Sequence, residues 1–165
     1  MENFVNEFEG SVRKFKKLLE KEQKKVEEIE KELEPIKNRL QEIETELLSI
    51  QREIKENEAR IREIKNHLNR IMKKTLEAQT DREIEMLERD RQRLLKELDD
   101  RKKLIEELKE KYHNLVLEEN DLVVKEEELE EKKLLHEERI KKLIRKLENA
   151  MKSLQRDIDR YKATS

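Results

Sequence analysis

A heptad repeat runs along nearly the whole chain and is interrupted only once, over residues 76–83. Apolar residues recur at alternating spacings of three and four residues over 5–78, and the same rhythm restarts with a new phase over 84–161. Such a repeat places a narrow apolar seam, made of the a and d positions, on one side of a helix that must be buried against another helix. Because the two runs are almost equal in length, the interruption predicts a hairpin.

The composition supports the same class of structure. Charged residues make up 50% of the chain and hydrophobic residues 33%, with one Gly, one Pro and no Cys. Apolar residues this sparse cover a stripe and cannot enclose a globular core, which leaves a coiled coil or a disordered polyampholyte. The regular period favours the coiled coil, because disorder has no reason to keep one.

We therefore predict an all-α fold, a long antiparallel two-helix coiled-coil hairpin that could also associate with a second copy. The chain is expected to form a single unit over 1–165, with arms at about 5–75 and 81–161 and a turn at about 76–80. Thr80 and Glu83 have the spacing of a capping box, in which the Thr80 hydroxyl accepts from the Glu83 amide and the Glu83 carboxylate accepts from the Thr80 amide. Since the turn contains neither Gly nor Pro, one uninterrupted helix is the alternative.

The stretch Thr80–Asp90 resembles the hairpin tip of the coiled-coil proteins that carry a C-terminal four-cysteine zinc ribbon. It reads Thr-Asp-Arg-Glu-Ile-Glu-Met-Leu-Glu-Arg-Asp, with a Leu four residues after the Glu of the turn and an acidic residue next to it. The resemblance implies an adaptor associated with nucleic acid or with other proteins. This chain has no Cys, so the ribbon and its metal site are not carried over.

Polar residues interrupt the seam at Glu22 and Asn57 in the first run and at Lys133 in the second, among others. Such residues typically specify the register of a coiled coil. If a positions meet d positions, Glu22 faces Lys133 in one register and Ile140 in the other. We expect the first, because leaving a buried charge unpaired costs about 3–5 kcal/mol. The register that pairs Glu22 with Lys133 leaves a longer loop between the helices. The capping box instead favours the shorter loop of the register that pairs Glu22 with Ile140.

Two surfaces are candidates for protein partners. The turn carries apolar side chains outside the seam, so partner binding at the tip competes with an ordinary capped loop; the candidate residues are Met72, Leu76, Gln79, Arg82 and Met86. The three Phe residues gather near the N-terminus, where they either pack in the core or form an end patch; they are Phe4, Phe8 and Phe15.

Catalysis and metal binding are not expected. His67, His113 and His136 share no spacing that would place two of them on one helix face at ligand distance. A two-helix rod also offers no water-excluded pocket in which carboxylates could act as acid and base. We therefore predict no catalytic, cofactor-binding or metal-binding residues and no enzymatic activity.

A basic cluster in the second arm is the one candidate for nucleic-acid binding. Its residues are Lys132, Lys133, Arg139, Lys141, Lys142, Arg145 and Lys146. Five Glu residues directly upstream favour a solvated face of mixed charge instead. The chain has no apolar run long enough to cross a bilayer and no signal-peptide pattern, so we expect a soluble, cytoplasmic protein without membrane insertion.

These features favour a structural or scaffold protein that mediates protein–protein interaction or assembly. A nucleic-acid-associated adaptor of the zinc-ribbon type without its ribbon is one alternative. A segment of a longer filament-like coiled coil is another.

Overall fold

The computed structural model describes residues 2–164, which form two helices joined by a short turn. α1 spans Glu2–Glu77 and α2 spans Asp81–Thr164, and the two pack against each other. The predicted all-α helical hairpin is therefore confirmed. The alternative of one uninterrupted helix is wrong, because residues 78–80 leave the helical conformation.

The length of the helices follows from their composition. Glu, Lys, Arg and Leu are good helix formers, and Gly and Pro each occur once in the chain. Ion pairs one turn apart add support along α2, as between Arg101 and Glu97 at 3.1 Å and between Lys103 and Asp99 at 3.1 Å. α1 continues through Pro35, whose ring removes one backbone hydrogen bond.

The helix pair divides into two packed units. Unit 1 consists of residues 2–39 of α1 with 122–164 of α2, and unit 2 consists of the continuous stretch 40–121. The prediction that the whole chain acts as one coiled-coil unit stays a prediction.

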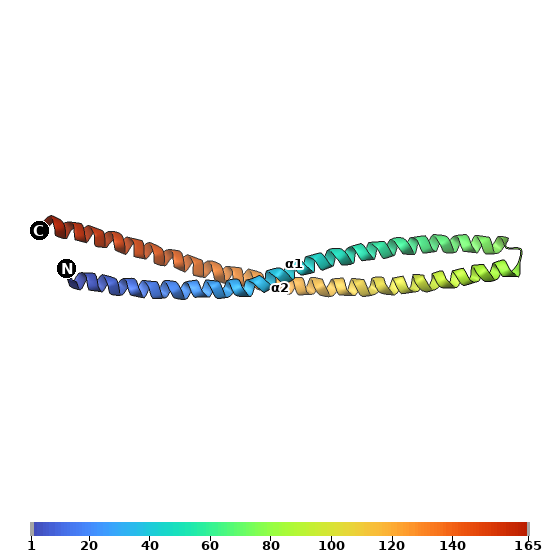
Figure 1. Ribbon diagram of the computed structural model, residues 1–165, viewed down its shortest axis with the longest axis horizontal. Coiled ribbons are helices and arrows are strands. Elements are labelled where there is room, and N and C mark those ends of the chain that lie inside the picture. The colour runs from blue at the N-terminus through green and yellow to red at the C-terminus, as the bar shows by residue number, and fades with distance from the viewer. Residues whose placement is uncertain (1, 165) are drawn as a thin grey trace. The chain divides into compact units, whose positions relative to one another are not determined.

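In unit 2, α1 and α2 run antiparallel on either side of the turn (Figure 1). With Val5 at position a in the first run and Ile84 at position a in the second, residues at d positions form most of its core, and Ile43 and Ile64 are fully buried. One cluster nearest the turn contains Ile64, Ile71 and Leu94, with further leucines packed around it at 68, 87 and 98. The apolar seam predicted from the repeat is thus buried between the two helices.

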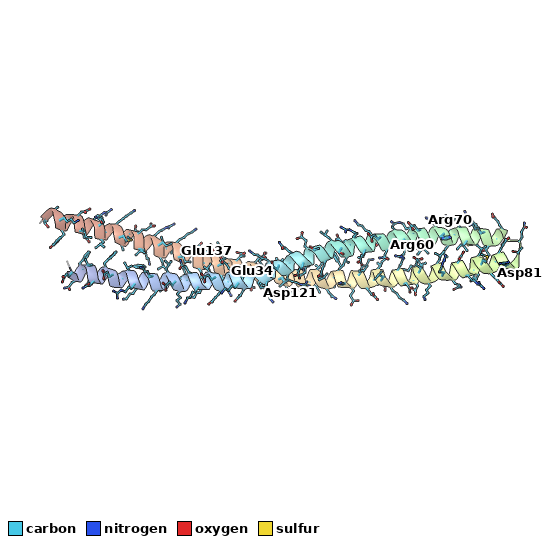
Figure 2. All side chains as sticks on the ribbon, in the orientation of Figure 1. Glu34, Arg60, Arg70, Asp81, Asp121 and Glu137 are labelled. Carbon is cyan, nitrogen blue, oxygen red and sulfur yellow. The ribbon has the colours of Figure 1, made fainter. Side chains whose placement is uncertain are left out.

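A polar layer interrupts this core. Asn57 is buried; its Nδ2 donates to the Glu53 carbonyl at 2.8 Å, and its Oδ1 accepts from Arg101 Nη1 at 2.7 Å. Glu97 accepts from Arg101 Nε at 3.1 Å and from both Nε and Nη2 of Arg60, at 3.0 and 3.1 Å. Figure 2 shows Arg60 on the side of α1 that faces α2. This chain of bonds joins the two helices by five polar groups, each of which has a partner.

Unit 1 has its own polar layer. Glu22 Oε2 contacts His136 Nδ1 at 2.5 Å, and Glu22 Oε1 lies 3.8 Å from Arg139. Lys133 lies 3.5 Å from Glu30 and 3.9 Å from Glu137 of its own helix. The expected pairing of Glu22 with Lys133 is therefore wrong, and the alternative that placed Glu22 opposite Ile140 is wrong as well.

The observed register lies between the two expected ones, because Glu22 meets His136, which is located between Lys133 and Ile140 in the sequence. In unit 2 the d residue Asn57 meets the d residue Arg101, and in unit 1 the d residue Glu22 meets the d residue His136. The two pairs are spaced by the same 35 residues, or five heptads, on each helix. Among residues 2–164 this register leaves no buried side-chain nitrogen or oxygen without a hydrogen-bond partner. This register therefore gives the buried polar side chains partners without the expected Glu22–Lys133 ion pair.

The Glu22 layer predicts a loss of stability in acid. Partial burial alone would raise the pKa of Glu22, but the hydrogen bond and charge of His136, with Lys25 and Arg139, outweigh it and lower the pKa below 4.5. A carboxyl whose pKa is lower in the folded state stabilises that state above its unfolded pKa, and this contribution is lost as the pH falls through the folded pKa.

We expect Glu22→Gln to destabilise unit 1 at neutral pH and to have little effect below the folded pKa of Glu22. Urea unfolding followed by circular dichroism at a series of pH values measures the difference. The exposed Glu20→Gln serves as the control on the same helix. Equal losses from Glu22→Gln at neutral and acid pH would contradict the assigned role of the carboxylate.

Candidate interaction surface at the hairpin tip

The tip is built by the turn and by the capping residues that end one helix and begin the next. The Ala78 amide donates to the Thr75 carbonyl at 3.4 Å, and α2 begins at Asp81. The Glu83 amide donates to the Thr80 hydroxyl at 3.2 Å, as the capping box predicted. The Glu83 carboxylate, however, accepts from the Gln79 amide at 3.4 Å instead of from that of Thr80. The first of these bonds closes the end of α1, and the other two cap the start of α2.

All five residues predicted for the tip are exposed. Met72 and Leu76 lie one turn apart near the end of α1, and Leu76 is 82% exposed. Arg82 and Met86 lie one turn apart at the start of α2, and Met86 is 60% exposed. Both helices thus expose large apolar side chains next to the turn.

A shallow hollow of about 430 Å³ opens beside the turn. Its apolar lining comes from Met86, with Ala78 and Leu87. Its charged lining consists of Lys74 and three carboxylates, Glu77, Glu83 and Asp90. The hollow therefore combines three apolar side chains with an excess of negative charge.

Compared with known proteins, the chain matches no family model, no curated protein and no solved structure. The resemblance of the tip to zinc-ribbon coiled coils stays a prediction, and function is argued from the surfaces of this chain. No helix within residues 2–164 is long and apolar enough to span a membrane. The same residues contain no group of three His, Asp or Glu side chains placed to hold a metal ion.

The sequence identified the tip but not the whole of its surface. Of the five predicted residues only Met86 lines the hollow, and the other six lining residues were missed. Ile84 was assigned to the seam, yet it is 41% exposed. On α2 the packed cluster begins at Leu87, so the first turn of that helix extends beyond the last apolar layer. The abrupt change of phase of the heptad repeat at the turn was the signal that could have indicated that the first turn of α2 is not packed against α1.

The other predicted sites lie in unit 1. Phe8 and Phe15 are half-buried and Phe4 is 41% exposed; a docking role for this end patch stays a prediction. In the basic cluster, Lys133 and Arg139 engage carboxylates. The remaining five members are exposed on α2; they are Lys132, Lys141, Lys142, Arg145 and Lys146.

A second basic stretch, on α1, was not predicted as a site. Residues 13–25 of α1 contain seven Lys and Arg against two Glu. The Glu22–Arg139 contact brings this stretch beside residues 139–146 of α2, which hold five Lys and Arg and no acidic residue. The charges were visible in the sequence, but only the register brings the two stretches together.

Proposed function

We propose that the protein is a non-enzymatic coiled-coil scaffold whose hairpin tip binds a protein partner. The observation that carries the proposal is the coincidence, at one turn, of exposed apolar side chains with a hollow that apolar side chains partly line. In protein–protein interfaces, binding energy concentrates on a few anchor residues that fill such hollows. The expectation that this scaffold works in the cytoplasm stays a prediction.

The charges around the hollow favour one kind of partner. Glu77, Glu83 and Asp90 outnumber Lys74, so a segment with an apolar anchor flanked by Lys or Arg fits best. A segment with acidic flanks would meet like charge at these three carboxylates. We therefore propose a basic, amphipathic segment of another protein as the occupant of the tip.

Selection from a displayed random-peptide library tests this preference without assuming a partner. The full-length chain is the bait, and peptides that also bind a Met86→Lys variant are removed. The remaining peptides are expected to carry a large apolar residue next to Lys or Arg. A set without basic flanks, or no peptide whose binding depends on Met86, would contradict the proposal.

The selected peptides then give the quantitative prediction. Met86→Lys replaces an apolar lining residue of the hollow by a charged one and is expected to weaken peptide binding by about 2 kcal/mol, or about thirtyfold. Met151→Lys is the matched control, because Met151 is 56% exposed on the same helix but belongs to unit 1. Both variants should keep the helicity of the native chain, since neither residue is buried. Equal affinities of the two variants, measured by isothermal titration calorimetry, would remove the tip as the binding site.

A further inference from the structure

One face of α2 in unit 1 carries an acidic group and a basic group on opposite sides of an apolar pair. On the exposed side of the helix, an acidic group of Glu127, Glu128 and Glu131 precedes the apolar pair, Leu134 and Leu135. After the pair come Glu138 and then a basic group, which consists of Lys141, Lys142 and Arg145. We call the two groups and the apolar pair, eight residues in all, the outer face of α2.

The spacing places these groups in line along the helix. Each of the two leucines lies seven residues after a glutamate and seven residues before a lysine, and Arg145 lies fourteen residues after Glu131. Residues separated by seven or fourteen lie on the same side of a helix in a coiled coil. The acidic and basic groups are therefore centred about 21 Å apart, with the leucines midway.

This face is not used by the hairpin itself. All eight residues are exposed, and Leu134 and Leu135 are 58% and 54% exposed. The residues of α2 that are turned toward α1, such as Leu129, His136 and Leu143, are half-buried instead. None of the six charged residues forms an ion pair with another residue of the described chain 2–164.

We propose that the outer face of α2 binds the same face of a second copy of this chain, with the two α2 helices antiparallel around a two-fold axis at Leu134 and Leu135. The rotation places Glu127 and Glu128 of each copy beside Lys142 and Lys141 of the other, while Glu131 comes level with Glu138 of the other copy. The four leucines meet at the centre between these complementary pairs, in the apolar core and polar rim that are usual for an interface. A two-fold contact of this kind closes on itself and gives a dimer.

Charge complementarity selects this occupant over others. A parallel arrangement of two copies would stack like charges on one another, at a cost of several kcal/mol in a close contact. A nucleic-acid strand lying along the face would gain contacts at the basic group but meet three carboxylates at the acidic group. The face is self-complementary only for an antiparallel second copy.

Charge reversal in trans tests the proposal with the full-length chain. We expect both the acidic-group variant (Glu127→Lys, Glu128→Lys, Glu131→Lys) and the basic-group variant (Lys141→Glu, Lys142→Glu, Arg145→Glu) to dimerise at least about a hundredfold more weakly than the native chain. Mixing the two variants should restore a dimer. Both groups of the acidic-group variant are positive and both groups of the basic-group variant are negative, so the two chains attract each other. Sedimentation equilibrium over a range of concentration and salt measures these constants.

A matched control lies in unit 2. Glu106, Glu107 and Glu110 have the same mutual spacing, the same heptad positions and the same exposure as the acidic group. Their triple change to Lys should leave the dimer unchanged. Circular dichroism establishes that each variant keeps the helicity of the native chain, so a weaker dimer is not mistaken for unfolding.

Disulfide formation locates the axis, because the native chain contains no Cys. Leu135→Cys is expected to give a covalent dimer on oxidation, whereas Leu117→Cys, similarly exposed on α2 in unit 2, should not. A monomeric mass at every concentration would overturn the proposal, as would dimerisation that both triple reversals leave intact. Binding of a poly(dT) oligonucleotide by a chain that stays monomeric would also overturn it and assign the basic group to nucleic acid.

Discussion

Replacing Ile64 with alanine is expected to lower the free energy of unfolding of unit 2 by about 2–5 kcal/mol. Ile64 is fully buried and packs against Ile71 and Leu94 in the cluster nearest the turn. The change removes three carbon atoms from a layer that only two helices enclose, so the lost contacts are not replaced by other core residues. Because this cluster also positions the turn, hydrogen exchange of the turn amides should accelerate as well.

Leu48→Ala is the control for this prediction. Leu48 lies on the same helix and in the same unit but is 58% exposed, so the expected loss is within about 0.5 kcal/mol. Urea unfolding followed by far-ultraviolet circular dichroism measures both variants. If the loss for Ile64→Ala were as small as that for Leu48→Ala, the apolar cluster would not be packed as described.

The second large effect is expected from the polar layer of unit 2. Asn57→Ala removes the acceptor of the Arg101 guanidinium, whose side chain is 34% exposed, and should cost about 1–2 kcal/mol in unfolding free energy. Arg101 keeps its bond to Glu97, which limits the loss. The double variant Asn57→Leu, Arg101→Leu replaces the pair by an apolar layer and should be more stable than Asn57→Ala.

That gain in stability should come with a less specific register. Polar pairs in a seam disfavour helix shifts that would separate them, whereas an apolar layer tolerates several alignments. Paired cysteines report the alignment: Ile50→Cys with Leu108→Cys lies one heptad from the Asn57–Arg101 pair and should cross-link efficiently. Leu47→Cys with Leu108→Cys should cross-link only weakly, and better in the double-leucine background. Unchanged cross-linking in that background would show that the apolar layers alone fix the register.

The fold could be predicted from the sequence because it depends on local signals. The seven-residue period defines helices with a single apolar seam, and the change of phase places the turn. The capping pair Thr80 and Glu83 located the start of α2 within one residue, since its geometry involves only neighbours in the chain. These signals do not require knowledge of what lies on the other helix.

The register could not be predicted in the same way, because it is a property of both helices together. The expectation was based on a single pair of charges and on a positions meeting d positions. In the structure, Asn57 and Arg101 complete one another in unit 2 while Glu22 and His136 do so in unit 1. Each pair alone is compatible with several alignments, and only their agreement selects one.

Only part of the surface of the tip could be predicted, because the rest also depends on both helices together. Exposed apolar residues such as Met86 could be recognised because they fall outside the repeat. The lining of the hollow could not, because it combines the end of α1 with the first three turns of α2, and the way these lie together depends on the register.

Burial along the hairpin also determines how it responds to mechanical force. Within residues 2–164 the buried hydrophobic side chains all lie between Ile29 and Leu115, and the residues near both termini belong to unit 1. A pull applied to Glu2 and Thr164 therefore separates the helices in the unzipping direction, one layer at a time, and half-buried layers open before any buried one. The extension at which the force needed to separate the helices first rises marks the Ile29 layer. The layers next to the turn separate last.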